Sequence, residues 1–141
     1  MDDKVMRITA IAKTQGEMIM HELIKGEHAD IEQLARMALT LHCVQGLMPE
    51  GRYRDITNNL IHLANIESCY IQLERKPDDL EAKAEFAKHR LILKEYSPRY
   101  LEGYEVDCQP YPLGSDERIN WIRLTCMAHI SGLGDSISVE M

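Results

Sequence analysis

The chain has 141 residues, the length of about one domain. It carries 23 acidic and 16 basic residues, for a formal net charge of −7, and 45% of its residues are apolar. These proportions are those of an ordinary soluble globular protein, and they exclude a disordered acidic tail, a collagen-like chain and a membrane protein. A domain of this size buries roughly two thirds of its unfolded surface, so it needs no disulfide or metal to fold.

The cysteines and the first residues indicate a cytoplasmic protein. Four cysteines are spread along the chain without paired spacing, unlike a secreted disulfide scaffold. The start, Met1 to Val5, has no basic segment followed by an apolar run, so we expect no signal peptide. No stretch approaches the ~18 apolar residues of a membrane span.

Acidic residues gather toward the end of the chain. Residues 101–141 carry seven acidic and two basic side chains. A nucleic-acid site needs a lysine or arginine for each phosphate contact, so an acidic chain is a poor binder of nucleic acid. The excess of acidic residues is better suited to keeping the protein soluble or to binding a partner protein with a basic surface.

Apolar residues recur at helical spacing almost throughout, while strand-like alternation is rare. We therefore expect a single all-α domain over residues 1–141, a bundle of about five helices. Prolines and a glycine predict an irregular segment over 104–114, and 133–141 is expected to be a frayed tail. The expected helices span about 3–25, 31–47, 52–75, 79–96 and 116–131.

Capping residues mark several of these helix boundaries. Gly26 suits the left-handed turn that ends a helix. Asp30 with Gln33, and Asp78 with Glu81, have the spacing of capping boxes. Ser115 is the expected N-cap of the last helix, with acidic residues favoured in its first turn by the helix dipole.

The fourth helix shows an apolar stripe that we expect to face the core. The stripe consists of Leu80, Ala84, Ala87 and Leu91, with Phe86 and Leu93 beside it. The short link after the third helix predicts that helices three and four pack as an antiparallel hairpin.

Glu67 falls inside the apolar stripe of the third helix. A buried carboxylate is costly unless it is paired or protonated. Two interpretations are open: the stripe drifts and Glu67 lies at its boundary, which we favour, or Glu67 is a buried acid or pairs with a cation from another helix.

Arg36 and His42 lie on the second helix with five residues between them. This spacing resembles the Arg-x(4–6)-His element of the HEPN-type ribonucleases, which are also small helical bundles. The resemblance implies that Arg36 holds the phosphate and that His42 assists attack by the 2′-hydroxyl, without a metal. The polar residue that usually follows the arginine is replaced by Met37.

Several histidines lie near carboxylates or thiols, the residue types that hold metals. The two Glu–His pairs lack the spacing of a di-iron bundle, whereas the two His–Cys sets could together supply four zinc ligands from two helices. A metal-binding helical bundle is therefore a second alternative, although we assign no metal and no cofactor. A solvated face or a buried free thiol explains each set. The sets are Glu17 with His21, Glu85 with His89, and His42 and Cys43 with Cys126 and His129.

The first helix carries more apolar residues than one face can bury. Met18, Ile19, Met20 and Leu23 are so closely spaced that some must lie on the surface or in an interface. We therefore expect a protein-binding module that acts as a regulator, inhibitor or adaptor, with a homodimer possible. Small acidic helical proteins of this class include regulators encoded by phages and mobile elements. The expected contact residues are Met18, Met20, Glu22, Glu102, Glu105, Asp107, Asp116 and Glu117.

Overall fold

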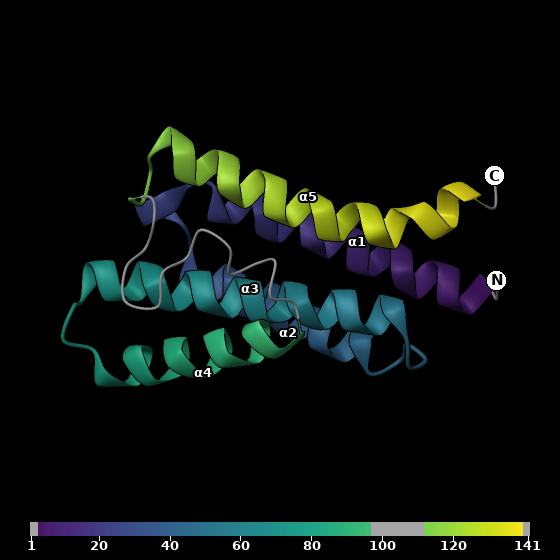
Figure 1. Cartoon of the computed structure of the whole chain (residues 1–141), viewed down its shortest axis with the longest axis horizontal. Helices are drawn as coiled ribbons and strands as arrows, with labels where there is room; N and C mark the ends of the chain where they lie inside the picture. Colours follow the sequence, from purple (N-terminus) through teal and green to yellow (C-terminus); the bar gives the residue numbers. More distant parts are fainter. Residues whose placement is uncertain (1–2, 97–111, 140–141) are drawn as a thin grey trace.

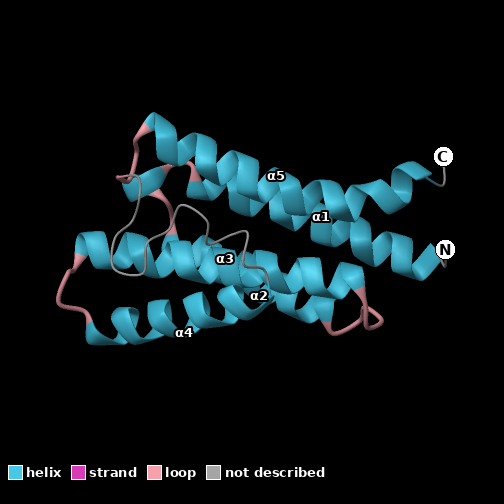
Figure 2. Cartoon of the chain, in the orientation of Figure 1, coloured by secondary structure: helices cyan, strands magenta, loops and turns pink. Residues whose placement is uncertain are grey.

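The computed structural model describes residues 3–96 and 112–139, and every regular element in these ranges is helical (Figure 2). This confirms the all-α prediction. None of the described helices combines the length and the apolar character needed to cross a membrane. The elements are α1 (Asp3–Leu23), the 3₁₀-helix η1 (Gly26–His28), α2 (Ile31–Gln45), α3 (Arg52–Arg75), α4 (Leu80–Tyr96) and α5 (Asp116–Val139).

Four of the helices form a bundle, and the fifth lies outside it. α1 packs against α2 and α5, and α3 packs against α2 and α5, so these four helices surround a common core. α1 begins and α5 ends at the same end of the bundle (Figure 1). α4 packs extensively on α3 alone, which confirms the predicted hairpin. α4 is therefore the most peripheral helix.

The main core is aliphatic and comes from the four bundle helices. Ile19, Leu34, Leu41, Leu60 and Leu133 are fully buried within it. Each such side chain contributes about 1.5–3 kcal/mol by its removal from water.

Three further buried residues lie on the hairpin formed by α3 and α4. Ile66, Cys69 and Ala82 are buried but lie apart from the main core cluster. α4 is thus held by a local contact with α3 and not by the core of the bundle.

Two of the predicted N-caps are confirmed by hydrogen bonds. Asp30 accepts from the backbone N–H of Gln33 (3.2 Å), and Ser115 accepts from the backbone N–H of Arg118 (3.2 Å). The prediction that Asp78 is the N-cap of the fourth helix was wrong by one position. Asp79 caps α4 by accepting from the backbone N–H of Ala82 (3.0 Å).

Gly26 has a φ of +62°, as its predicted role requires. A Cβ at this position would also lie 3.1 Å from the backbone nitrogen of Gly114, which cannot move like a flexible side chain. We expect Gly26→Ala to lower the free energy of unfolding by about 1–3 kcal/mol, measured by urea titration. Gly46→Ala is the control, because Gly46 has a helical φ of −61°. Equal losses in the two variants would contradict this account.

The last helix is longer than predicted. α5 continues to Val139, so the expected end of the helix at Gly132 was wrong. The expected frayed tail over 133–141 was also wrong for residues 133–139, which are helical. Gly132 lies inside the helix, where a Cβ would come within 2.8 Å of Ile56 Cδ1. Glycine here permits close packing and does not end the helix. Of the expected irregular segment, residues 104–111 lie outside the described residues.

The predicted core face of α4 was also wrong. Its stripe of leucines and alanines faces solvent: Leu80 is 78% and Leu91 is 62% exposed. A second stripe, at the same helical spacing, contains Ala82, Phe86 and His89 and lies against α3. Phe86, the chain's only phenylalanine, buries more apolar area than an alanine, and Ala82 permits close approach.

Candidate functional site

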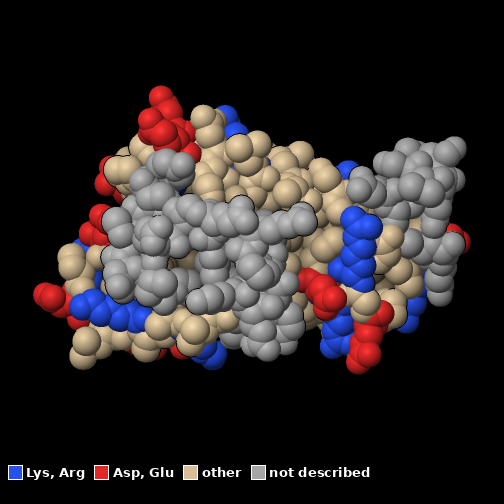
Figure 3. Space-filling view, in the orientation of Figure 1, with Lys and Arg blue, Asp and Glu red and all other residues tan. Residues whose placement is uncertain are grey.

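The outward face of α4 is an apolar surface. We call Leu80, Ala84, Ala87 and Leu91 the α4 stripe; all four are exposed. Their spacing places them on one line along the helix, about 17 Å long. Glu81, Lys83 and Lys88 are exposed beside the stripe. In Figure 3 the lower edge of the molecule, where α4 lies, shows uncharged surface interrupted by charged groups.

Further exposed apolar side chains lie on α1 and on α2, two helices that pack against each other. Ile11 and Met18 are 47% and 46% exposed on α1, and Leu39 and Leu47 are both 62% exposed on or just after α2. Ile11 and Met18 are seven residues apart, about two helical turns, and so lie on one side of α1. Met18 thus remains a contact candidate.

Two other predicted contacts on α1 have structural roles. Met20 is 8% exposed and belongs to the core, so we withdraw it as a contact residue. The Glu22 carboxylate accepts hydrogen bonds from Lys25 Nζ (3.0 Å) and from the backbone N–H of Asp30 (2.9 Å). Glu22 therefore fixes the link between α1 and α2.

The remaining predicted contacts are acidic. Asp116 and Glu117 are exposed in the first turn of α5, and acidic atoms gather there in Figure 3. Negative charge at this place also stabilises the helix through its dipole. Their role in binding stays a prediction. Glu102, Glu105 and Asp107 lie outside the described residues.

Arg36 and His42 do not converge. The Arg36 side chain is 71% exposed and lies 3.7 Å from Glu32 on the same helix, and His42 is also exposed. Six positions of an α-helix place the two side chains about 120° apart around its axis. The ribonuclease interpretation stays a prediction, and no contact between these two residues favours it.

Glu67 forms a buried ion pair with Arg118 of α5. Their side chains are 1% and 2% exposed, and the Arg118 guanidinium lies 4.2 Å from the centre of the Tyr70 ring. The boundary interpretation of Glu67 was therefore wrong, and the salt bridge to another helix is correct. We missed Arg118, although it precedes Ile122, Cys126 and Leu133 at helical spacing in the buried stripe of α5.

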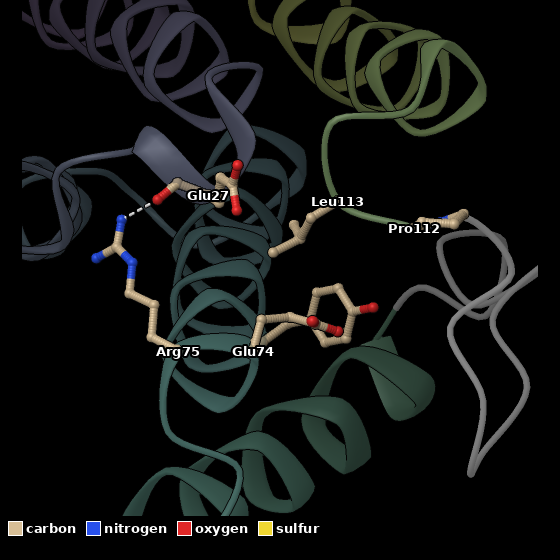
Figure 4. Close-up of a pocket in the computed structure, with 6 residues that line it drawn as sticks. Glu27, Glu74, Arg75, Pro112 and Leu113 are labelled. Carbon is tan, nitrogen blue, oxygen red and sulfur yellow. Dashed lines mark hydrogen bonds between the residues drawn. The ribbon is translucent and has the colours of Figure 1, made fainter.

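A hollow of about 490 Å³ lies between η1, the end of α3 and the turn before α5 (Figure 4). Arg75 reaches across from α3 and donates to the backbone carbonyls of Glu27 and Ala29, the second at 2.8 Å. These bonds anchor η1 to α3. The residues lining the hollow are Glu27, Tyr70, Glu74, Arg75, Pro112 and Leu113.

Two histidines join α4 to α3. Nδ1 of His62 lies 3.0 Å from Nδ1 of His89, and His89 Nε2 lies 3.3 Å from the Glu85 carboxylate. If His89 donates Nε2–H to Glu85, its Nδ1 accepts the Nδ1–H of a neutral His62. Burial lowers the pKa of His62 to about 4, with nearby His89, Lys88 and His42 acting in the same direction. The expected solvated face for Glu85 and His89 was wrong, because the His89 side chain is 13% exposed.

The cysteines in the described part of the chain are free thiols. Burial raises the pKa of Cys126 to about 12 and that of Cys69 to about 11, which makes both thiols unreactive. Among the described residues, no three histidine, cysteine or acidic side chains are placed to hold a metal ion. Of the predicted sets, Cys43 is exposed on α2 while Cys126 and His129 are buried in α5.

Comparison of the chain with protein-family models, with curated proteins and with solved structures finds no match.

Proposed function

We propose that this chain is a protein-binding module that acts as a regulator, inhibitor or adaptor by occluding or scaffolding a partner. The observation that supports this most strongly is the exposed α4 stripe, in which Leu80 is 78% and Leu91 is 62% accessible. An apolar line that spans about three helical turns is the pattern by which amphipathic helices dock on other proteins. The partner surface that fits it is apolar.

The position of α4 supports the same proposal. Because α4 packs extensively on α3 alone, its outer side is not enclosed by the other helices of the bundle. Isolated surface leucines are ordinary in folded proteins, but a line of four apolar residues on one helix is typical of an interaction site. The exposed apolar side chains of α1 and α2 offer a further, separate area for contact.

Leu91→Glu is expected to weaken partner binding roughly 30-fold or more, because docking would bury the new carboxylate against apolar surface. The measurement is capture of partners from native lysate on the immobilised chain, followed by titration of the partner that wild type retains. Leu124→Glu on α5 is the control, since Leu124 is 74% exposed but lies on another helix.

Circular dichroism of both variants verifies that the fold is kept. A partner retained by wild type and by Leu124→Glu, but lost by Leu91→Glu, supports the proposal. Equal retention by all three proteins, or a monomeric wild type that retains nothing, contradicts it.

A further inference from the structure

We propose that pH controls the docking of α4 on α3, and that α4 leaves α3 when His62 and His89 are both protonated while the other four helices stay together. This property belongs to the inner side of α4, so it is independent of what the outer stripe binds. Two features of the structure support it: the contact between the two histidines, and the small set of contacts that holds α4 on α3.

The two imidazole rings face each other through the same ring atom. Nδ1 of His62 lies 3.0 Å from Nδ1 of His89, and the ring centres are 5.3 Å apart. At this distance one nitrogen must donate a hydrogen bond and the other must accept it. A neutral pair meets this condition, and so does a pair with one added proton, because one ring still offers a lone pair at Nδ1. When both rings are protonated, two N–H donors face each other and two cations repel.

The groups around the pair leave the second proton uncompensated. The Glu85 carboxylate lies 3.3 Å from Nε2 of His89 and can balance one positive charge. Burial lowers the pKa of His62 to about 4, and His89, Lys88 of α4 and His42 of α2 act in the same direction. Burial also lowers the pKa of His89, against the effect of Glu85 and together with that of Lys88. The docked pair therefore resists full protonation, and full protonation in turn opposes docking.

α4 is held by few contacts, and the bundle does not depend on it. It lies beside α3 and packs extensively on this helix alone (Figure 1). Among the described side chains of its inner side, Ala82 is buried, while Phe86 and His89 are half-buried. The main core cluster contains no described residue of α4, so the other helices keep their core when α4 moves away. Such a peripheral element opens at a lower free energy than the whole domain.

The linkage between protonation and docking gives the sign and the size of the effect. In the undocked state both rings are in water, where the pKa of histidine is near 6.5. Because the pKa of His62 is about 4 when α4 is docked, the undocked state binds more protons between these two pH values. Docking is thus favoured at neutral pH and weakens as the pH falls. For His62 alone, the ratio of docked to undocked molecules is expected to fall roughly 100-fold between pH 7.5 and pH 4.

Labelling of thiols distinguishes release of α4 from unfolding of the whole chain. Cys69 is buried on α3 near Glu85 of α4, whereas Cys126 is buried in the main core. The native protein is treated with dilute dipyridyl disulfide, which also reacts in acid, so that labelling reports the population of the open form. Peptide mass spectrometry identifies the labelled position. Each rate is divided into that of the same thiol in the urea-unfolded chain at the same pH, which gives a protection factor.

The protection factor of Cys69 is expected to be lower than that of Cys126 at every pH, and to fall roughly 100-fold between pH 7.5 and pH 4. His62→Gln is the diagnostic variant, because glutamine still offers an N–H to Nδ1 of His89 but takes up no proton. It is expected to remove most of the pH dependence at Cys69. His129→Gln is the matched control, since His129 is buried in α5, and it is expected to flatten the curve of Cys126 and not that of Cys69.

The wild-type comparison decides the proposal even if His62→Gln folds poorly. Equal protection of Cys69 and Cys126 at every pH would mean that α4 and the bundle open together, which overturns it. Protection of Cys69 that does not change between pH 7.5 and pH 4 also overturns it. So does a folded His62→Gln variant in which the protection of Cys69 falls as steeply as in wild type.

Discussion

Arg118→Met is expected to lower the free energy of unfolding by about 3–5 kcal/mol. The substitution keeps much of the side-chain volume but leaves the Glu67 carboxylate, 1% exposed, without the Arg118 cation. A buried charge that loses its counter-ion carries its desolvation penalty without the compensating attraction. Because a domain of this size is stable by about 5–15 kcal/mol, this loss is a large fraction of the total.

Urea titration followed by circular dichroism measures this effect. The double variant Glu67→Leu/Arg118→Met is expected to recover most of the loss, because it removes both charges and keeps the site filled. Arg36→Met is the surface control, since the Arg36 side chain is 71% exposed, and a change within about 0.5 kcal/mol is expected there. A loss below about 1 kcal/mol for Arg118→Met would mean that water screens the ion pair.

Acidification is the second large effect. Burial lowers the pKa of His129 to about 4, against a contribution from the Thr125 carbonyl that favours the protonated ring. The unfolded chain therefore binds more protons than the folded one between the folded value and the ordinary histidine value near 6.5. The contribution of neutral His129 to the free energy of unfolding is fully present above pH ~6.5. As the pH falls toward 4, about 3 kcal/mol of this contribution is lost.

The measurement is the free energy of unfolding at a series of pH values from 8 to 4. His129→Gln is expected to flatten the curve in this interval, whatever its effect on the absolute stability. Part of the slope of the unfolding free energy against pH is expected to remain in this variant. It comes from His62 and His89, whose pKa values burial also lowers. His28→Gln is the control, because the His28 side chain is 83% exposed. An unchanged slope in His129→Gln would contradict the account.

Features that depend on neighbouring residues could be predicted from the sequence. The caps at Asp30 and Ser115 and the positive φ at Gly26 are properties of a few consecutive residues, and the structure has all three. Hydrophobic periodicity likewise gave five helices, because burial of one face imposes the helical repeat on the sequence. The number of helices can therefore be predicted from residues that are close together in the sequence.

The orientation of α4 could not be predicted, because its sequence contains two apolar stripes. One holds Leu80 and Leu91, the other Ala82 and Phe86, and periodicity alone weighs them equally. The choice depends on the surface of α3, where His62 pairs with His89 and Cys69 is buried near Glu85. That surface is a property of the assembled hairpin and not of the isolated helix.

The buried ion pair was only half predictable. Glu67 stands out in the sequence because it interrupts an apolar stripe. Its partner Arg118 lies 51 residues away on another helix, and the sequence does not state that α3 and α5 pack together. A search for a cation at a buried helical position would have found Arg118, since it begins the stripe of α5 that continues through Ile122 and Cys126.

Photo-crosslinking from α4 tests the central claim, that the α4 stripe binds protein, most directly. A photoreactive amino acid is placed at position 87, inside the stripe, and at position 124 on α5, which is also exposed. The account predicts a discrete adduct from position 87, either with a second copy of this chain or with one other protein, and none from position 124. The same adducts from both positions, or none from position 87, would contradict it.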